Sequence, residues 1–337
     1  MTPLRADAAG PAERALRERA GGWPDLPSVS DLTADALLEI TRREGVDFAT
    51  ALFFDRFHKF TVRAAFIRRI DALRQAASTS RVRLDARVVI VPGALYVDRP
   101  DLGVDGRLVR EVAAGHGLES SLIPVASFGS LQHNAGLIRA WLGQHSGERI
   151  ILVSLSKGGA DVKLALAAPD AAGLFRNVAA WVNVCGPLNG SLMANWVLAG
   201  RARTWLIRWK FKRQKRDFQF VTGLQRGQGT PLDFAVPLPP GMKMLSLVGF
   251  PLKRHMTTGF SRFCHHTLAA HGPNDGTTTL LDVLDWPGEI YPVWGADHYF
   301  RPASVARELI AAVLRHLEEA MPATPDASHF SPPARMV

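Results

Sequence analysis

Continuous apolar runs recur along the chain, separated by stretches in which apolar residues return every three or four positions. A run without polar residues is typical of a strand buried on both faces of a parallel sheet. Such apolar segments predict strands at Val88–Val91, Leu122–Val125, Ile150–Leu155, Val178–Val184, Met244–Val248 and Ile290–Trp294. Helical spacing follows at 104–114, 131–144 and 304–317. Because strands and helices alternate, we expect an α/β fold: a mostly parallel sheet with right-handed crossovers, flanked by helices.

The same pattern divides the chain into segments. Residues 1–28 are rich in Ala, Gly, Arg and Pro and lack an apolar stripe, so they are predicted to be a flexible leader. An N-terminal helical extension is expected over 29–80, the main domain over 81–320, and a disordered tail over 321–337. Within the extension, apolar residues at helical intervals are expected to pack in the core: Phe48, Leu52, Phe53, Phe57, Phe60 and Phe66.

One predicted strand, 150–155, runs into a short turn with a serine at its centre. The turn reads Ser154-Leu-Ser156-Lys-Gly158-Gly159 and is followed by residues of helix-forming composition. Strand, tight turn and helix form the layout of a nucleophile elbow, in which the central side chain points away from the sheet. Small residues are needed two positions before and after the serine, because strand and helix backbones approach each other there. The alternative is a polar strand-to-helix loop, with Ser154 as a helix-capping residue.

A serine hydroxyl needs a base to accept its proton and a carboxylate to orient that base. With a serine elbow, the expected chain order is Ser, then Asp or Glu, then His. Asp275 lies in the loop 272–277, and His298 follows the last predicted strand. Both side chains are therefore expected at carboxyl ends of strands, where reactive groups gather in parallel sheets. Asp282 and Asp297 are the alternative acids, and Asp275 can also serve only to start an Asx turn.

Other reactive side chains have simpler interpretations. His265, His266 and His271 lie close together in the sequence, but their spacing matches no standard zinc signature. Cys185 is expected to be a small buried residue rather than a nucleophile. Ser191 is expected to turn the chain rather than to react. No metal and no cofactor are predicted.

Five segments together resemble the α/β-hydrolase superfamily, and within it the lipase-like serine esterases. They occur in order within residues 82–318: Pro92-Gly93, the Ser156 elbow, Cys185-Gly-Pro187-Leu-Asn-Gly190-Ser191, Asn274-Asp275-Gly276 and Asp297-His298. The resemblance implies an α/β-hydrolase fold with a Ser-His-Asp catalytic triad. In that triad Ser156 is the nucleophile, His298 the general base and Asp275 the residue that orients the histidine.

The resemblance also implies an oxyanion hole built from backbone N–H groups. One belongs to Lys157, the residue after the nucleophile, and the second to Ala94 or Leu95, in the turn after the first predicted strand. The next residue, Tyr96, is a candidate to line the substrate site. Two positions depart from the family pattern: Ser154 stands in place of a glycine, and Lys157 in place of a neutral residue.

A basic insertion lies between two predicted strands, over about 188–240. It contains the segment 201–216, which holds two tryptophans and no acidic residue. Lipase-like relatives often place a lid here, so Trp205 and Trp209 are candidates to cover the active site. Because Trp with Lys and Arg suits a bilayer interface, peripheral contact of 201–216 with an anionic membrane is the second interpretation. An acidic partner or substrate is the third. Nucleic acid is not expected, because charge alone is no recognition module.

Composition narrows the class of protein. At 337 residues, 47% hydrophobic and 21% charged, the chain has the composition of a globular protein with a sizeable core. Two cysteines give no disulfide framework, and the N-terminus lacks a signal pattern, so a cytoplasmic location is expected. Much of the net charge of +9 lies in the basic insertion.

These features predict a serine hydrolase that cleaves a small-molecule carboxylic ester, lipase- or esterase-like, through an acyl-enzyme. The same residues serve acyltransferases, thioesterases and amidases, which are alternatives within the fold. A further alternative is a non-catalytic module of hydrolase fold that binds anionic lipid or a protein partner.

Overall fold

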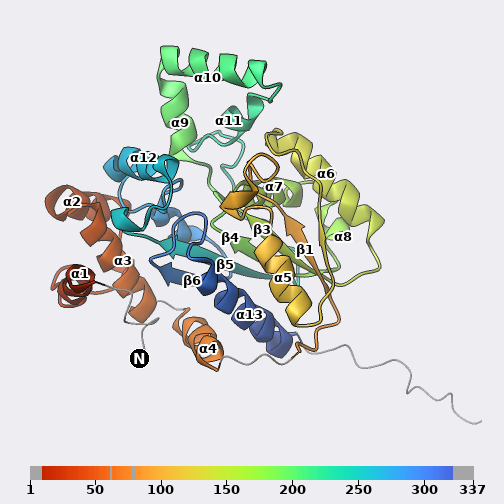
Figure 1. Cartoon of the computed structure of the whole chain (residues 1–337), viewed down its shortest axis with the longest axis horizontal. Coiled ribbons are helices and arrows are strands. Elements are labelled where there is room, and N and C mark those ends of the chain that lie inside the picture. Colours follow the sequence, from red (N-terminus) through yellow and green to blue (C-terminus); the bar gives the residue numbers. More distant parts are fainter. Residues whose placement is uncertain (1–9, 61–62, 77–80, 322–337) are drawn as a thin grey trace, which may run out of the picture.

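The computed structural model describes residues 10–60, 63–76 and 81–321. At its centre is a six-stranded sheet in which all neighbouring strands are parallel, in the order β2-β1-β3-β4-β5-β6 (Figure 1). The strands are β1 (Arg87–Val91), β2 (Ser120–Leu122), β3 (Ile150–Leu155), β4 (Val178–Val184), β5 (Lys243–Phe250) and β6 (Glu289–Trp294). The predicted α/β class with a mostly parallel sheet is confirmed.

The second strand differs from its prediction, 122–125, by beginning and ending earlier. The backbone N–H of Ile123 still donates to the carbonyl of Ile90 at 2.9 Å. Pro124 follows, and because proline has no N–H it cannot extend the ladder. The apolar run therefore continues past the end of β2.

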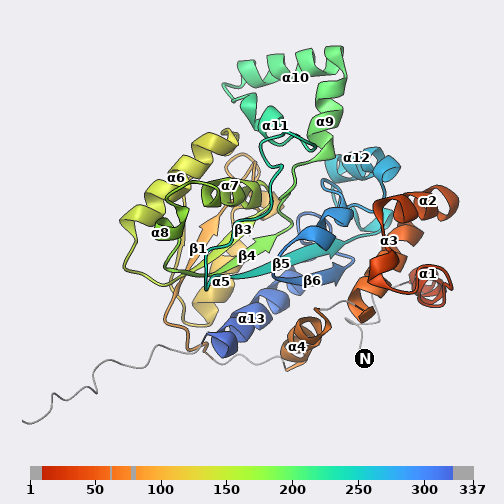
Figure 2. The same cartoon turned by 180° about the vertical axis from the view of Figure 1, so that it is seen from behind.

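Helices cover both faces of the sheet, because its strands are apolar on both sides. α5 (Arg107–Gly115) and α13 (Ala303–Ala320) contact each other on one face (Figure 1). α6 (Leu131–Gln144), α7 (Lys157–Leu166) and α8 (Ala171–Leu174) cover the other face, as the reverse view shows (Figure 2). Short 3₁₀ helices lie in the connections: η2 (Val29–Asp31), η3 (Pro100–Leu102), η4 (Lys253–His255), η5 (Ala269–His271) and η6 (Leu280–Asp285).

The N-terminal helices lie against the β6 edge of the sheet (Figures 1 and 2). They are α1 (Pro11–Gly21), α2 (Ala34–Glu44), α3 (Val46–Phe60) and α4 (Ala64–Gln75). α3 contacts α1, α2, β5 and β6, while α4 contacts β6 and α13. The extension therefore covers an edge strand whose free N–H and C=O groups would otherwise invite pairing with another chain.

Aromatic side chains of α3 join this extension to the sheet. Phe53 is fully buried and lies edge-on to Phe250 of β5, with ring centroids 5.3 Å apart. Such pairs add about 0.5–1.5 kcal/mol to the effect of burial. The predicted core residues Phe48, Leu52, Phe53, Phe57 and Phe66 are buried, whereas the side chain of Phe60 lies outside the described part of the chain.

The start of the chain differs from the predicted flexible leader, because Pro11–Gly21 forms α1 and packs on α3. Glu13 of α1 is buried and contacts Arg254, His255 and Trp294. These contacts are polar and leave no apolar stripe in the sequence, so the packing of this helix could not be predicted from the hydrophobic pattern. Residues 1–9 and 322–337, which include most of the predicted tail, lie outside the described residues.

The basic insertion forms a three-helix cap, made of α9 (Leu192–Ala199), α10 (Arg201–Arg213) and α11 (Gln219–Gly223), which projects from the rest of the molecule (Figures 1 and 2). The cap has an apolar cluster of its own, in which Ala194, Phe211 and Val221 pack with Leu131 of α6. α12 (Gly259–Leu268) contacts the base of α9.

Replacing Phe53 by Ala tests the role of the extension. We expect the free energy of unfolding to fall by about 3–5 kcal/mol, because the substitution leaves a cavity between α3 and β5. Phe260→Ala is the matched control: this ring is 57% exposed, so we expect a change within about 0.5 kcal/mol. Urea denaturation measures both. Equal effects of the two substitutions would contradict the view that the extension and the sheet share one core.

Candidate active site

Ser156 lies in the tight turn between β3 and α7, with a φ of 49° and a ψ of −125°. A positive φ is uncommon for a residue with a side chain and costs of order 1–3 kcal/mol. A Cβ on Gly158 would lie 2.5 Å from the carbonyl oxygen of Val91, and one on Gly159 would lie 2.3 Å from Oδ1 of Asn183. Because α7 approaches β1 and β4 so closely, only glycine fits at these two positions. The predicted elbow geometry is present.

Ser154, the departure from the usual glycine, is fully buried in β3. Its Oγ accepts a 2.8 Å hydrogen bond from Nε1 of Trp181 and donates to Oδ1 of Asn183 at 3.3 Å. The residue therefore bonds to the neighbouring strand β4 and does not cap a helix. This hydroxyl satisfies an indole N–H that would otherwise be buried without a partner, which is costly.

Three predicted side chains lie in one line of hydrogen bonds. Oγ of Ser156 is 2.8 Å from Nε2 of His298, and Nδ1 of His298 is 2.8 Å from Oδ2 of Asp275. A carboxylate can only accept, so Nδ1 carries the proton and Nε2 is left as the acceptor that faces the serine hydroxyl. An imidazole held in this tautomer can take the hydroxyl proton while the carboxylate stabilises the resulting cation.

Asp275 is buried, and its hydrogen bonds favour the ionised carboxylate. It accepts from the backbone N–H of Thr277 at 2.8 Å and of Thr278 at 2.7 Å, and from Oγ1 of Thr278 at 2.8 Å. Burial raises the pKa of Asp275, but His298 and these donors outweigh it, so the pKa lies below its ordinary value. The backbone N–H of His298 also donates to the carbonyl of Asp275 at 2.9 Å, which ties the two loops together.

The alternative acids have other partners. Asp297 accepts from Oγ1 of Thr257 at 2.5 Å and from the N–H of Tyr299 at 3.0 Å. Asp282 pairs with Arg226 and accepts from Thr279. Of these acids, Asp275 is the one that bonds to the imidazole of His298.

The predicted oxyanion donors lie on two segments that meet at Ser156. Lys157 is the first residue of α7, and N–H groups of a first helical turn have no partner within the helix. A Cβ on Gly93 would lie 3.0 Å from Cβ of Ser156, so the turn that carries Ala94 and Leu95 begins against the serine. Leu95 has a φ of 70°, which turns the chain sharply there.

The side chain of Lys157 points into the protein. Its Nζ bonds to both carboxylate oxygens of Asp161, at 2.6 and 2.8 Å, and Asp161 also accepts from Nδ2 of Asn134 at 2.9 Å. Burial lowers the pKa of the lysine and raises that of the aspartate, while their mutual attraction opposes both shifts. The second departure from the family pattern is thus an i,i+4 pair beneath the elbow. Asp161 and Asn134 were not predicted, and the i,i+4 spacing was the available signal for the aspartate.

Ser156 and His298 line a cavity of about 600 Å³, a size that suits a small ligand. Its apolar wall comes from η3, α5 and α13 and from the ends of β3, β4 and β5, and includes Leu102, Val104, Leu108, Val109, Val184, Leu247 and Ile310. The sequence did not indicate these lining residues. Charged residues of the lining pair with one another, as Arg307 does with Glu111 at 2.7 Å.

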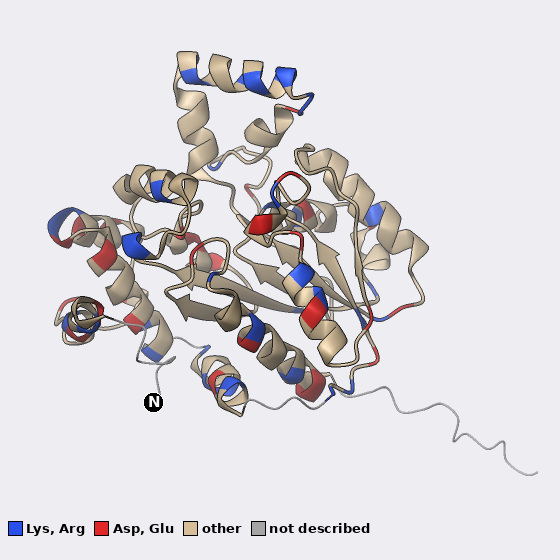
Figure 3. Ribbon diagram, viewed as in Figure 1, with Lys and Arg blue, Asp and Glu red and all other residues tan. Residues whose placement is uncertain are grey.

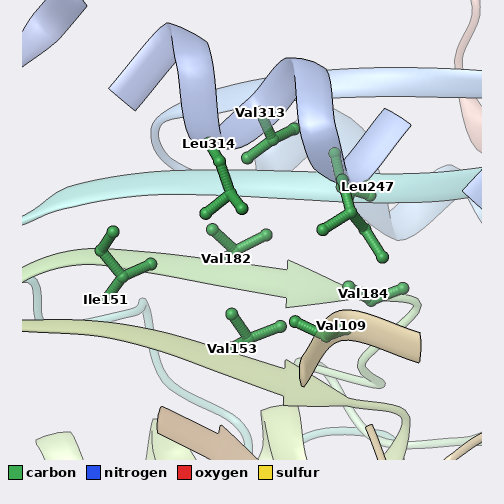
Figure 4. Close-up of a pocket in the computed structure, with 9 residues that line it drawn as sticks. Val109, Ile151, Val153, Val182, Val184, Leu247, Val313 and Leu314 are labelled. Carbon is green, nitrogen blue, oxygen red and sulfur yellow. The ribbon is translucent and has the colours of Figure 1, made fainter. Parts of the chain in front are cut away.

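A second, small void of about 20 Å³ lies between α5, α13 and the sheet (Figure 4). It is lined only by aliphatic side chains. Val109, Val184, Leu247 and Ile310 line both spaces. These four side chains are therefore the partition between the larger cavity and an apolar space deeper in the molecule.

The predicted lid and substrate residues lie elsewhere. Trp205 and Trp209 are 66% and 46% exposed on α10, outside the lining of the Ser156 cavity. Tyr96 is also outside this lining, and its hydroxyl donates to the carbonyl of Val125 at 2.8 Å. Among the described residues, the lining includes none from 188–240. The cap therefore contributes no side chain to the wall of this cavity.

One group of described side chains has the spacing of metal ligands, although the sequence did not suggest it. Cys185, Asp275 and His298 bring donor atoms within 4.8 Å of one another. Nδ1 of His298 and Asp275 are already hydrogen-bonded to each other. Burial raises the pKa of the Cys185 thiol well above its ordinary value, with the nearby Asp275 adding to the shift, so this thiol stays protonated and is a poor ligand or nucleophile. Ser191 caps α9, as its expected turning role requires.

The histidines at 265, 266 and 271 are not gathered. His265 is buried, and burial lowers its pKa. His266 and His271 are exposed. Within the described ranges, they form no metal-ligand group.

Solved structures of esterases and lipases resemble this chain. A metagenomic carboxyl esterase is 23% identical, with a TM-score of 0.53 over 72% of this chain and 78% of the esterase. The mature form of a lipase from Bacillus licheniformis is 22% identical, with a TM-score of 0.52 over 71% of this chain and 94% of the lipase. No protein-family model and no curated protein matches the sequence. At these identities the likeness bears on the fold, and the predicted α/β-hydrolase fold is confirmed.

The buried pair beneath the elbow can be tested by Lys157→Met. We expect the free energy of unfolding to fall by about 3–5 kcal/mol, because Asp161 is left buried without its cation. The double substitution Lys157→Met/Asp161→Leu should recover most of this loss. Arg99→Met, which breaks the exposed pair of Arg99 with Asp101, should change stability little. If Lys157→Met costs no more than Arg99→Met in urea denaturation, the pair does not hold the elbow.

Proposed function

We propose that this protein is a serine hydrolase that cleaves carboxylic esters through an acyl-enzyme. The observation that carries the proposal is the line of hydrogen bonds from Ser156 through His298 to Asp275, at the edge of a cavity with an apolar wall. The same residues occupy the expected order along the chain. The esterase and lipase of similar fold support the same kind of chemistry.

The reaction follows from the hydrogen bonds. Oγ of Ser156 attacks the ester carbonyl carbon while Nε2 of His298 takes the hydroxyl proton, and the carboxylate of Asp275 stabilises the imidazolium. As the tetrahedral intermediate collapses, the imidazolium gives this proton to the departing alkoxide, which leaves as the alcohol. Water then attacks the acyl-enzyme by the same route, and the acid and free Ser156 are released.

The negative charge that develops on the carbonyl oxygen needs donors fixed in advance. We assign this role to the backbone N–H of Lys157 and to that of Ala94 or Leu95. Both segments meet at Ser156 because Gly93 allows the first turn to approach it. The buried Lys157–Asp161 pair then fixes the start of α7, so the lysine acts through its backbone while its side chain anchors the helix.

We further propose that the acyl group lies along the apolar wall between α5 and α13. Val109 and Ile310 face the cavity from the two helices, and Leu247 closes it from the sheet. The partition that they form with Val184 sets the end of the space for a straight acyl chain. Esters with an apolar acyl group are therefore favoured over small polar esters.

Labelling with a fluorophosphonate probe tests the nucleophile. The wild-type chain should take one label, and Ser156→Ala should take none and lose turnover of p-nitrophenyl esters by roughly a thousandfold or more. Ser30→Ala, which removes an exposed serine of the N-terminal extension, should label like the wild type. Asp275→Asn should label slowly, because the amide favours the wrong imidazole tautomer. If the intact wild-type protein takes no label, the serine hydrolase proposal fails and the alternative of a non-catalytic module is favoured.

Changing the partition tests the acyl site. Ile310→Ala should join the cavity to the deeper void and shift the preference among p-nitrophenyl esters toward longer acyl chains by several-fold in kcat/KM. Val109→Phe should fill the space and shift the preference toward acetate. Leu206→Ala on the cap is the control, since this side chain is 55% exposed and lies outside the cavity lining. If all three variants show the same preference among acyl chain lengths, the acyl group does not lie along this wall. In that case, normal labelling of Ser156 by the fluorophosphonate probe would show that the assignment of the nucleophile still holds.

A further inference from the structure

The cap helix α10 exposes large apolar side chains to solvent. Trp205, Leu206 and Trp209 are 66%, 55% and 46% exposed. The opposite side of the same helix supplies the cap's own core, where Phe211 is buried and Ile207 packs against the apolar cluster. α10 is therefore apolar on an inner side that is covered and on an outer side that is not. An uncovered apolar surface of this kind marks an interaction site.

The helix periodicity gives the outer side a definite arrangement. At 100° per residue, Ala202, Trp205 and Trp209 fall within one narrow stripe opposite Phe211. Cations lie on both flanks of this stripe. Arg201, Arg208 and Lys212 fall on one flank, and Lys210 and Arg213 on the other.

None of these cations has an acidic partner among the described residues, although Arg208 lies over the ring of Phe218 at 4.7 Å. Figure 3 shows basic and no acidic residues along α10. Across the described residues, the exposed side chains of Arg201, Lys210 and Lys212 form no ion pair, and neither do Arg208 and Arg213. Arg213 lies over the ring of Trp209 at 5.0 Å. By contrast Arg216, just after the helix, pairs with Asp98 and so anchors the cap.

We propose that the outer side of α10 docks on an anionic membrane surface, with Trp205 and Trp209 at the boundary between headgroups and acyl chains and the flanking cations on anionic headgroups. Tryptophan is enriched at this boundary, and Lys or Arg beside an apolar stripe is the pattern of helices that lie in the interface plane. A lid would turn these rings toward Ser156, but they lie outside its cavity. Nucleic acid would use the cations and leave the central apolar stripe unexplained.

The docking is peripheral. None of the described helices is both long enough and apolar enough to cross a bilayer. α12 adds exposed Phe260 and Phe263 beside α9, and Phe263 stacks edge-on with Trp196 at 5.4 Å. Apart from Val97, the exposed large apolar side chains of the described residues therefore lie on the cap and on the helix at its base.

Vesicle co-sedimentation of the full chain tests the proposal without any catalytic readout. Binding is expected to vesicles of phosphatidylcholine mixed with phosphatidylserine, to weaken as salt rises, and to be much weaker on phosphatidylcholine alone. Trp205→Ala/Trp209→Ala should weaken partitioning by about tenfold or more, and Trp205→Phe/Trp209→Phe should retain most of it. Lys210→Gln/Lys212→Gln should also weaken it by roughly tenfold or more.

The matched charge control is Arg68→Gln/Lys243→Gln, which removes two exposed cations from α4 and the start of β5. This variant should bind vesicles like the wild type, and thermal melts should show that all variants stay folded. Equal loss in this control, or no loss on replacing the tryptophans, would overturn the proposal. Tight binding to a DNA or RNA duplex that persists in Trp205→Ala/Trp209→Ala and competes with vesicles would assign the surface to nucleic acid instead.

Discussion

The close approach of α7 to the ends of β1 and β4 is the constraint on which the site depends. Gly158 and Gly159 leave no room for a Cβ against Val91 and Asn183, so the helix can begin directly above the strand ends. This contact forces the φ of Ser156 to a positive value and directs its Oγ toward Nε2 of His298. The strain at one residue is compensated by the packing of a whole helix against the sheet.

Two polar arrangements support this contact from below. Ser154 joins β3 to β4 through Trp181 and Asn183, and Lys157 joins the first turn of α7 to Asp161. Both positions depart from the family pattern, and both departures face the protein interior. Neither side chain lines the cavity, so both departures change contacts beneath the elbow and not the cavity wall.

The parts of the fold and site that could be predicted from the sequence are those that leave a local pattern or that occur in a known order along the chain. Apolar runs located the strands, and the Ser156 turn with Asp275 and His298 followed from the order of residues at strand ends. Contacts between distant segments were not accessible in this way. Glu13 contacts His255, which lies 242 residues later in the chain, and Val109 and Ile310 line the same cavity only because α5 and α13 contact each other. Such pairs depend on helix packing, for which a single sequence carries no periodic signal.

The cap shows why composition alone left its role open. A segment with tryptophans and cations fits a lid, a membrane contact or an acidic partner, since all three use the same residue types. The direction of the side chains separates these uses, and this direction depends on which side of α10 packs on α9 and α11. Phe211 faces that core, which turns Trp209 outward by about half a helical turn. The proposed acyl wall between α5 and α13 and the apolar side of α10 therefore belong to different surfaces. The ester selectivity and the membrane docking that we propose would thus depend on separate residues and could vary independently.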